Sequence, residues 1–220
     1  MLTVTGTAGC LLIVKHCTGD RLNFGLAAEL ARAFCQRVEM VIVDDDIALP
    51  DLPRARGVVG TLFVHKIVGA MAEEGADLET IAAVAQRAVD GVASIGMPLD
   101  TCILPGAPKQ DRSAAGRAEF GLGIQGEAGV DKVTYEGARH AMELKRLVLS
   151  IGHRPHAALI NTPGSAIGLE MSIFAAEVIR SRMFDCIEWL IGHPPVMPSV
   201  DMKGFWASLL PVGPAEEAES

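Results

Sequence analysis

The chain has 220 residues, of which 50% are hydrophobic and 21% are charged, and its net charge of −8 disfavours contact with nucleic-acid phosphates. No apolar run reaches the roughly 18–20 residues of a membrane span, and the N-terminus lacks the basic segment of a secretory signal. The five cysteines form no C-x-x-C pair, which indicates free thiols in a reducing compartment. Together with the charge and the lack of a membrane span, this leads us to expect a cytoplasmic protein without membrane or nucleic-acid partners.

Short apolar runs alternate with longer stretches of helical periodicity, which predicts an α/β fold. In chain order, the predicted strands are Cys10–Val14, Met40–Val43, Thr101–Leu104, Phe120–Ile124, Ala157–Ile160, Cys186–Leu190 and Trp206–Val212. The predicted helices are Leu22–Gln36, Gly60–Glu74, Leu78–Ser94, Tyr135–Ile151 and Ile167–Met183, with Asp77 as the N-cap of the third.

We expect two subdomains and a tail. Residues 1–95 form a partial first α/β subdomain, residues 96–213 a second α/β subdomain with a mixed sheet, and residues 214–220 a disordered acidic tail. The first predicted strand begins already at Cys10, although a parallel strand usually has neighbours on both sides. We therefore expect that a segment belonging upstream is missing. The helix-face residues Leu26, Leu30 and Phe34 then lack part of their cover, which favours a homodimer or a complex.

The first predicted strand is followed by Lys15, and Thr18-Gly19-Asp20 leads from there into a helix. In open α/β sheets, small ligands bind beyond the carboxyl ends of the strands. Asp20 is therefore placed to accept a proton from a substrate hydroxyl, while Lys15 polarises a neighbouring oxygen. The alternative interpretation is structural: Asp20 caps the helix that begins near Leu22, and Lys15 extends its ammonium into solvent.

A glycine-rich segment, Gly121–Gly126, matches the dinucleotide-binding pattern G-x-G-x-x-G. A dinucleotide site needs a helix directly after the third glycine, and helical periodicity resumes only near Tyr135. A glycine-lined substrate loop is therefore favoured, because glycines let the backbone approach a small ligand closely. The sequence contains no Walker-type phosphate loop.

Other polar and aromatic residues fit structural roles, and we expect no metal site. Asp44-Asp45-Asp46 fits a solvated turn better than a Mg²⁺ site. Proline interrupts the pair His153 and His156, which therefore fits loop positions better than a metal site. Trp189 and Trp206 stand in apolar windows and fit core positions.

Six segments, which together extend over nearly the whole chain, carry a family resemblance. They are Leu11–Phe24 (LLIVKHCTGDRLNF), Val41–Ile47 (VIVDDDI), Gly57–Gly75 (GVVGTLFVHKIVGAMAEEG), Ser94–Gly106 (SIGMPLDTCILPG), Phe120–Gly129 (FGLGIQGEAG) and Ser199–Leu210 (SVDMKGFWASLL). In this order they resemble the substrate-binding (K) subunit of the dihydroxyacetone kinases. The patterns VK-x-x-TGD-x-x-NF and G-x-GI-x-GE-x-G are the specific ones, because neither is a general feature of α/β proteins.

The resemblance implies the two-part α/β fold of the dihydroxyacetone-kinase K subunit, usually a dimer. It implies binding of dihydroxyacetone or a related small ketose or polyol, with Asp20 as the catalytic residue and Lys15, Asp20 and Gln125 as substrate-binding residues. By the same resemblance, a nucleotide-binding kinase subunit would carry the phosphoryl donor, either ATP with Mg²⁺ or a nucleotide regenerated by a phosphoprotein. This chain itself would bind no cofactor.

The chain departs from the family in two places. Gln125 stands where the family has the histidine that bonds covalently to the ketone carbon, and an amide nitrogen cannot make that attack. The family's upstream GGGSGHEP segment, which supplies a second histidine, has no counterpart here. Besides an active kinase subunit, two alternatives therefore stay open: a catalytically inactive paralogue that binds a ligand or regulates, and a dinucleotide-dependent oxidoreductase.

Overall fold

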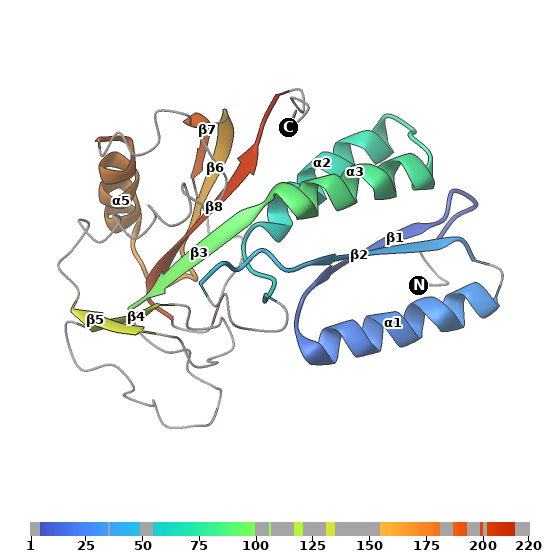
Figure 1. Cartoon of the computed structure of the whole chain (residues 1–220), viewed down its shortest axis with the longest axis horizontal. Coiled ribbons are helices and arrows are strands. Elements are labelled where there is room, and N and C mark those ends of the chain that lie inside the picture. The colour runs from blue at the N-terminus through green and yellow to red at the C-terminus, as the bar shows by residue number, and fades with distance from the viewer. Residues whose placement is uncertain are drawn as a thin grey trace, which may run out of the picture.

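The computed structural model describes residues 5–34, 36–48, 55–99, 106, 117–120, 131–134, 155–180, 187–192, 199 and 202–213. Two main sheets organise these residues, one near each end of the long axis in Figure 1. The mixed α/β fold that the sequence predicts is thereby confirmed. Among the described residues, no helix combines the length and the apolar character needed to cross a membrane.

The first sheet is a parallel pair with helices on both faces. Strand β1 (Cys10–Lys15) pairs with β2 (Val38–Val43) in a register that sets Cys10 against Val38 and Lys15 against Val43. Helix α1 (Thr18–Ala33) lies on one face, and α2 (Thr61–Glu73) with α3 (Leu78–Gly91) lies on the other (Figure 1). Because successive side chains of a strand point to opposite faces, β1 contributes apolar residues to both helical layers.

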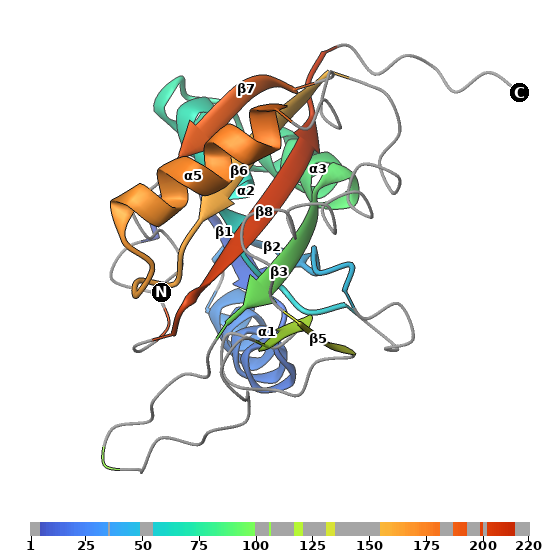
Figure 2. The ribbon, with the colours of Figure 1, turned by 90° about the vertical axis from the view of Figure 1, so that its left-hand side faces the viewer.

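The second sheet has four strands in the order β3-β8-β6-β7. Strand β8 (Gly204–Pro211) is antiparallel to both β3 (Ala93–Pro98) and β6 (His156–Asn161), whereas β6 is parallel to β7 (Ile187–Gly192). Helix α5 (Gly168–Arg180) crosses one face of this sheet (Figure 2) and buries Met171, Phe174 and Val178 against it. A short antiparallel pair, β4 (Arg117–Phe120) and β5 (Asp131–Thr134), lies beside β3.

The two sheets are joined where the chain leaves β2. The Ser94 N–H donates to the backbone oxygen of Asp45 at 2.7 Å, and the Ile47 N–H donates to the backbone oxygen of Ser94 at 2.9 Å. One apolar cluster also includes residues of β2, α2, α3, β6 and β8, so a common core connects the two sheets. The carboxyl ends of β1 and β2 therefore point toward the four-stranded sheet (Figure 1).

Strand β3 is the main element that the sequence pattern misplaces. Periodicity predicts a helix to Ser94, but α3 ends at Gly91 and Ala93–Pro98 is a buried strand. Gly96 and Pro98 weaken the strand signal of this segment. The glycine has a packing reason, since a Cβ atom at Gly96 would stand 2.7 Å from Cδ1 of Trp206, its cross-strand partner. The predicted segments Thr101–Leu104 and Tyr135–Ile151, and Phe120–Ile124 beyond its first residue, lie outside the described residues.

Candidate functional site

Lys15 and the start of α1 lie at the same corner, beyond the carboxyl end of β1. Lys15 is the last residue of the strand, and α1 begins at Thr18 after a short link with Cys17 in an extended conformation at the N-cap. This is the edge of a parallel sheet at which small ligands bind in open α/β folds. The structure therefore confirms the strand and the helix on which the predicted site depends, but Thr18 and Gly19, expected to lead into the helix, already belong to it.

Asp20 lies within the first turn of α1 and not at its cap. The helix begins one turn before Leu22, Cys17 occupies the N-cap position, and no side chain caps the helix by a hydrogen bond. The predicted cap role of Asp20 is therefore wrong: the polar first turn carries no apolar periodicity from which its helical form could be recognised. The Asp20 carboxylate is half-buried, and none of the hydrogen bonds and ion pairs among the described residues involves it. The positive end of the helix dipole favours a carboxylate at this position.

A loop closes over the ends of β1 and β2 and holds the backbone beside Lys15. The His16 N–H donates to the Val43 oxygen at 2.8 Å, and the Gly57 N–H donates to the His16 oxygen at 3.0 Å. A Cβ atom at Gly57 would collide with the backbone of His16 and Val43 and would stand 2.7 Å from Cγ of Lys15. Gly57 is therefore a positioning residue that sequence reasoning missed. No local pattern marks it, because its contacts are with strands distant in sequence.

Asp45 and Asp46 are buried, with only 2% and 4% of their surface exposed, so the predicted solvated turn is wrong for both. Asp45 accepts hydrogen bonds from the Val58 N–H at 2.7 Å and the Gly60 N–H at 2.8 Å. The Ser94 hydroxyl also donates to Asp45. These three donors occupy both carboxylate oxygens, which makes the Mg²⁺ alternative equally unsuitable for this residue.

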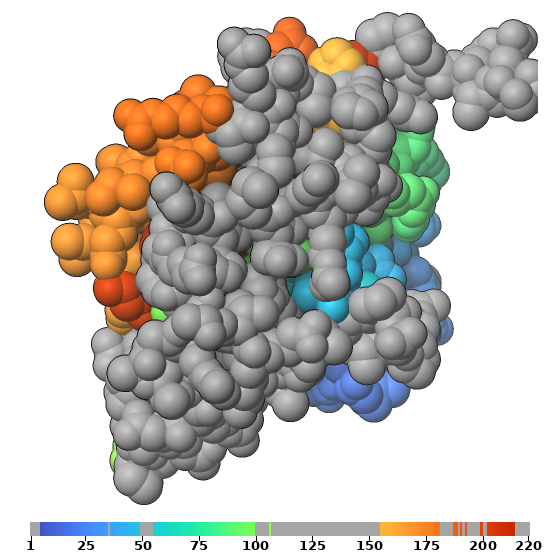
Figure 3. All heavy atoms as spheres, turned by 60° about the vertical axis from the view of Figure 1, so that its left-hand side comes forward, coloured from blue at the N-terminus to red at the C-terminus, as the bar shows by residue number. Residues whose placement is uncertain are grey.

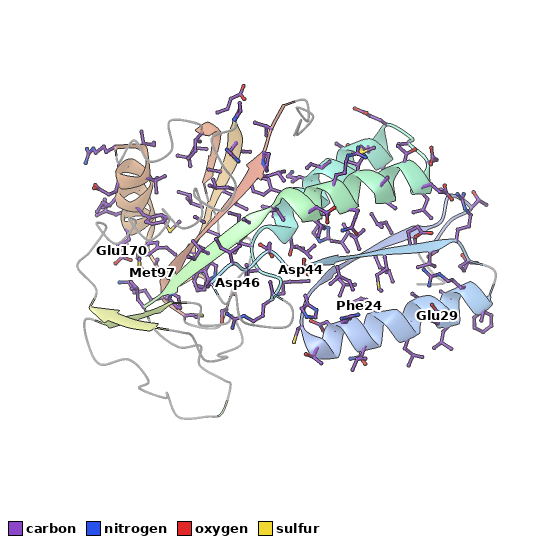
Figure 4. All side chains as sticks on the ribbon, viewed as in Figure 1. Phe24, Glu29, Asp44, Asp46, Met97 and Glu170 are labelled. Atoms are coloured by element: carbon purple, nitrogen blue, oxygen red, sulfur yellow. The ribbon has the colours of Figure 1, made fainter. Side chains whose placement is uncertain are left out.

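Asp46 is fixed by an ion pair and by the backbone. The Arg56 guanidinium lies 2.8 Å from its Oδ2, and the Ala48 N–H donates to its Oδ1 at 3.0 Å. Figure 4 shows Asp46, and Asp44 beside it, between the end of β2 and strand β3. Charged residues are buried when they are paired in this way. Together the two aspartates fix the junction between the sheets.

Burial raises the pKa of Asp45 above the ordinary value of 3.8, because a charged carboxylate loses its hydration inside the protein. The hydrogen bonds from Ser94, Val58 and Gly60 act in the opposite direction and lower the pKa, but burial has the larger effect. Asp45 also stabilises the start of α2, because it accepts a hydrogen bond from the N–H of Gly60, the N-cap residue of that helix. The carboxylate therefore satisfies donors that the start of α2 would otherwise leave unpaired.

Other residues singled out from the sequence have mixed outcomes. His156 is fully buried in β6, so its predicted loop position is wrong. The apolar pattern begins only at Ala157, so it did not indicate that the strand includes the histidine before it. Trp206 is 3% exposed and its predicted core position is confirmed. The Trp189 side chain, His153 and Gln125 with its loop lie outside the described residues.

The arrangement at the β1 corner suits a small polar molecule. An ammonium donates hydrogen bonds to a carbonyl or hydroxyl oxygen, and a carboxylate accepts a proton or hydrogen bond from a hydroxyl. Lys15 and Asp20 supply these two groups from adjoining elements.

Comparison with known proteins identifies relatives over nearly the whole chain. The model of the Dak1 domain matches residues 1–219. The dihydroxyacetone kinase of Citrobacter freundii is 44% identical over 210 residues, which are 92% of this chain and 37% of that protein. The PTS-dependent dihydroxyacetone kinase 1, dihydroxyacetone-binding subunit DhaK, of Listeria innocua is 36% identical over 216 residues, 92% of this chain and 65% of that subunit. The chain thus spans less than two thirds of either relative.

Solved structures have the same fold. The native crystal structure of the Citrobacter freundii dihydroxyacetone kinase superposes with a TM-score of 0.93 and 41% identity, covering 97% of this chain and 40% of that one. A protein described as the dihydroxyacetone kinase operon co-activator Dha-DhaQ superposes with a TM-score of 0.90 and 28% identity, covering 97% of this chain and 69% of that one. A kinase and a co-activator therefore share this architecture.

Proposed function

Since this chain belongs to the Dak1 domain family, we propose that it binds dihydroxyacetone or a related small ketose or polyol and presents it for phosphorylation. The observation that carries the proposal is the corner beyond β1, where Lys15 ends the strand and Asp20, without a described partner, lies in the first turn of the helix that follows. The names of the relatives support the ligand class, because both are described by their action on dihydroxyacetone or their binding of it.

In the proposed reaction, Asp20 acts as the general base. It accepts the proton of the substrate hydroxyl while the hydroxyl oxygen forms its bond to phosphorus and the bond between phosphorus and the donor breaks. Lys15 donates to the neighbouring oxygen of the ligand and fixes its orientation. Gln125 adds a reversible hydrogen bond and no covalent bond, because its amide nitrogen is not nucleophilic. Phosphoryl transfer requires mainly positioning and charge stabilisation, which suits so small a set of groups.

We propose that the phosphoryl donor is held by a partner, a nucleotide-binding kinase subunit. The donor is ATP with Mg²⁺ or a nucleotide regenerated by a phosphoprotein. Two observations support this division: the sequence has no Walker-type phosphate loop, and the Listeria innocua relative is described as the dihydroxyacetone-binding subunit of a kinase. We also propose a homodimer, because α1 exposes an apolar stripe whose members Leu22, Leu26, Leu30 and Phe34 are 55–69% exposed.

The decisive experiment combines this chain with the nucleotide-binding part of a dihydroxyacetone kinase, ATP, Mg²⁺ and dihydroxyacetone. We expect a new phosphate ester in the ³¹P NMR spectrum only when both proteins are present. Calorimetric titration of this chain alone with dihydroxyacetone tests the binding step separately. Absence of both binding and transfer would contradict the proposal.

A second candidate function, a ligand-binding regulator without turnover, is favoured by Gln125 and by the structural likeness to the co-activator. It predicts binding of dihydroxyacetone without phosphoryl transfer in the same experiment. In both functions we expect no covalent adduct with the mass of dihydroxyacetone in the mass spectrum of the incubated protein. A Gln125→His variant that gains such an adduct would show that the remaining pocket accepts the ketone.

A further inference from the structure

A chain of buried hydrogen bonds runs from the second sheet to the end of β2. The hydroxyl oxygens of Ser208 in β8 and Ser94 in β3 lie 2.6 Å apart, and the two residues are direct partners in neighbouring strands (Figure 1). The Ser94 hydroxyl gives its only proton to Asp45, so its oxygen accepts from Ser208. The three residues are 0%, 0% and 2% exposed, so bulk water does not replace a lost partner.

The Asp45 carboxylate passes this connection on to the loop before α2. Its two oxygens accept the N–H groups of Val58 at 2.7 Å and Gly60 at 2.8 Å. A Cβ atom at Gly60 would stand 2.5 Å from Oδ2 of Asp45 and 3.0 Å from Oγ of Ser94, so the loop backbone packs directly on both side chains. One buried carboxylate therefore fixes the loop 57–60 to strand β3.

The same loop touches Lys15 at its other end. The Gly57 N–H donates to the oxygen of His16, the residue after Lys15. The place of a Cβ atom at Gly57 is taken by the backbone of His16 and Val43 and by Cγ of Lys15. Because these groups are already in close contact, a shift of the loop changes the space that is open to the lysine stem.

We infer that Ser94 and Ser208, both in the second sheet, are positioning residues for Lys15 at the β1 corner. They act through Asp45 and the loop 57–60, and neither contacts the ligand. By restricting the lysine stem before a ligand arrives, they reduce the conformational entropy that is lost when the ammonium is fixed on the ligand. The second half of the chain thereby contributes to a site whose ligand-binding groups Lys15 and Asp20 come from the first half.

The first test is residue-resolved hydrogen exchange without ligand, which does not depend on the proposed function. Ser94→Ala removes the donor to the carboxylate, and Ser208→Ala, the milder variant, removes only the far hydroxyl. We expect exchange at the amides of His16 and Gly57 to become at least about tenfold faster in Ser94→Ala and about threefold faster in Ser208→Ala. The control Val178→Ala truncates the core under α5, outside this chain of hydrogen bonds, and should change both rates less than about twofold.

The second test is calorimetric titration of the same variants with dihydroxyacetone, and this part rests on the proposed function. We expect the dissociation constant to rise about tenfold in Ser94→Ala and about threefold in Ser208→Ala, and to change less than about twofold in Val178→Ala. In the double variant, the loss of Ser208 should add nothing to the loss of Ser94, because Ser208 acts only through Ser94. A purely structural role of the serines would lower stability without this pattern.

Two results would overturn the inference. In the first, exchange at His16 and Gly57 is unchanged in Ser208→Ala, or Val178→Ala changes it as much as the serine variants do. In the second, exchange becomes faster but all variants bind dihydroxyacetone as tightly as the wild type, so the position of the loop does not matter to the ligand. If the wild type itself binds no dihydroxyacetone, the proposed function fails, and the exchange rates alone decide whether the serines hold the loop.

Discussion

Asp45 and Asp20 stand at corresponding places, each beyond the carboxyl end of a strand and near the start of a helix. Asp45 follows β2, is 2% exposed, and accepts hydrogen bonds from three groups around the start of α2. Asp20 follows β1 in the first turn of α1, is half-buried, and has no partner among the described residues. The same chemical group therefore stabilises the fold at one strand end, whereas at the other it has no partner in the described part of the chain, as the proposed role in ligand binding requires.

The exposed apolar surfaces of the two halves also differ in what surrounds them. The stripe on α1 lies on a helix that covers one face of the two-stranded sheet. Helix α5, orange in Figure 3, instead covers the larger four-stranded sheet and exposes Leu169, Ile173 and Ile179 on its outer side. The two exposed apolar surfaces therefore differ in the size of the sheet that their helix covers, which has two strands under α1 and four under α5.

The largest expected effect of a substitution is on stability, at Asp45. In Asp45→Ala, two backbone N–H groups and the Ser94 hydroxyl lose a buried acceptor, which we expect to cost about 5 kcal/mol of unfolding free energy. Urea unfolding measures the loss as a lower midpoint with an unchanged slope. The matched control is Asp44→Ala, a half-buried neighbour, which should cost less than about 1 kcal/mol. Equal losses in the two variants would refute the distinction between them.

This contrast also shows what the sequence predicts and what it does not. The apolar strand before Lys15 and the helix after it follow from local patterns, and the structure confirms both. The burial of Asp45 could not be predicted, because its partners Val58, Gly60 and Ser94 are 13, 15 and 49 residues away. From the sequence alone, three consecutive aspartates predict a solvated turn, because the distant hydrogen-bond donors that bury Asp45 cannot be recognised there. Hydrophobic periodicity reports which face is buried, and not which polar groups meet there.

The second largest expected effect is a loss of phosphoryl transfer on substitution of Asp20. Asp20→Asn keeps the size of the side chain but cannot accept the hydroxyl proton, so we expect phosphoryl transfer to fall by about 10²–10⁴-fold. Stability should change by less than about 0.5 kcal/mol, because no described contact is lost. Initial rates with the partner subunit and urea unfolding of the same preparation measure both quantities. Full activity in Asp20→Asn would show that the Asp20 carboxylate is not the base.

A smaller effect is expected on ligand binding, at Lys15. Lys15→Met keeps the apolar part of the side chain beside Gly57 and removes the ammonium. We expect the dissociation constant of dihydroxyacetone to rise by about 10–100-fold, the equivalent of one hydrogen bond to a charged group. Calorimetry measures the change, with Lys66→Met on the exposed surface of α2 as the control. If both variants bind alike, Lys15 does not contact the ligand.

The smallest effect is a pH dependence that belongs to Asp45. Its pKa in the folded protein is raised above 3.8 by burial, so the folded state holds the proton more tightly than the unfolded state does. The resulting stabilisation is present below 3.8 and is lost as the pH rises through the raised value, at a rate of at most about 1.4 kcal/mol per pH unit. Asp45→Asn removes this titration, so the stability of the wild type relative to the variant should decline as the pH rises from 3.8. Urea unfolding at a series of pH values measures the difference and cancels the other titrating groups. A relative gain with rising pH would mean that the hydrogen bonds from Val58, Gly60 and Ser94 outweigh burial, and that Asp45 is held as an anion.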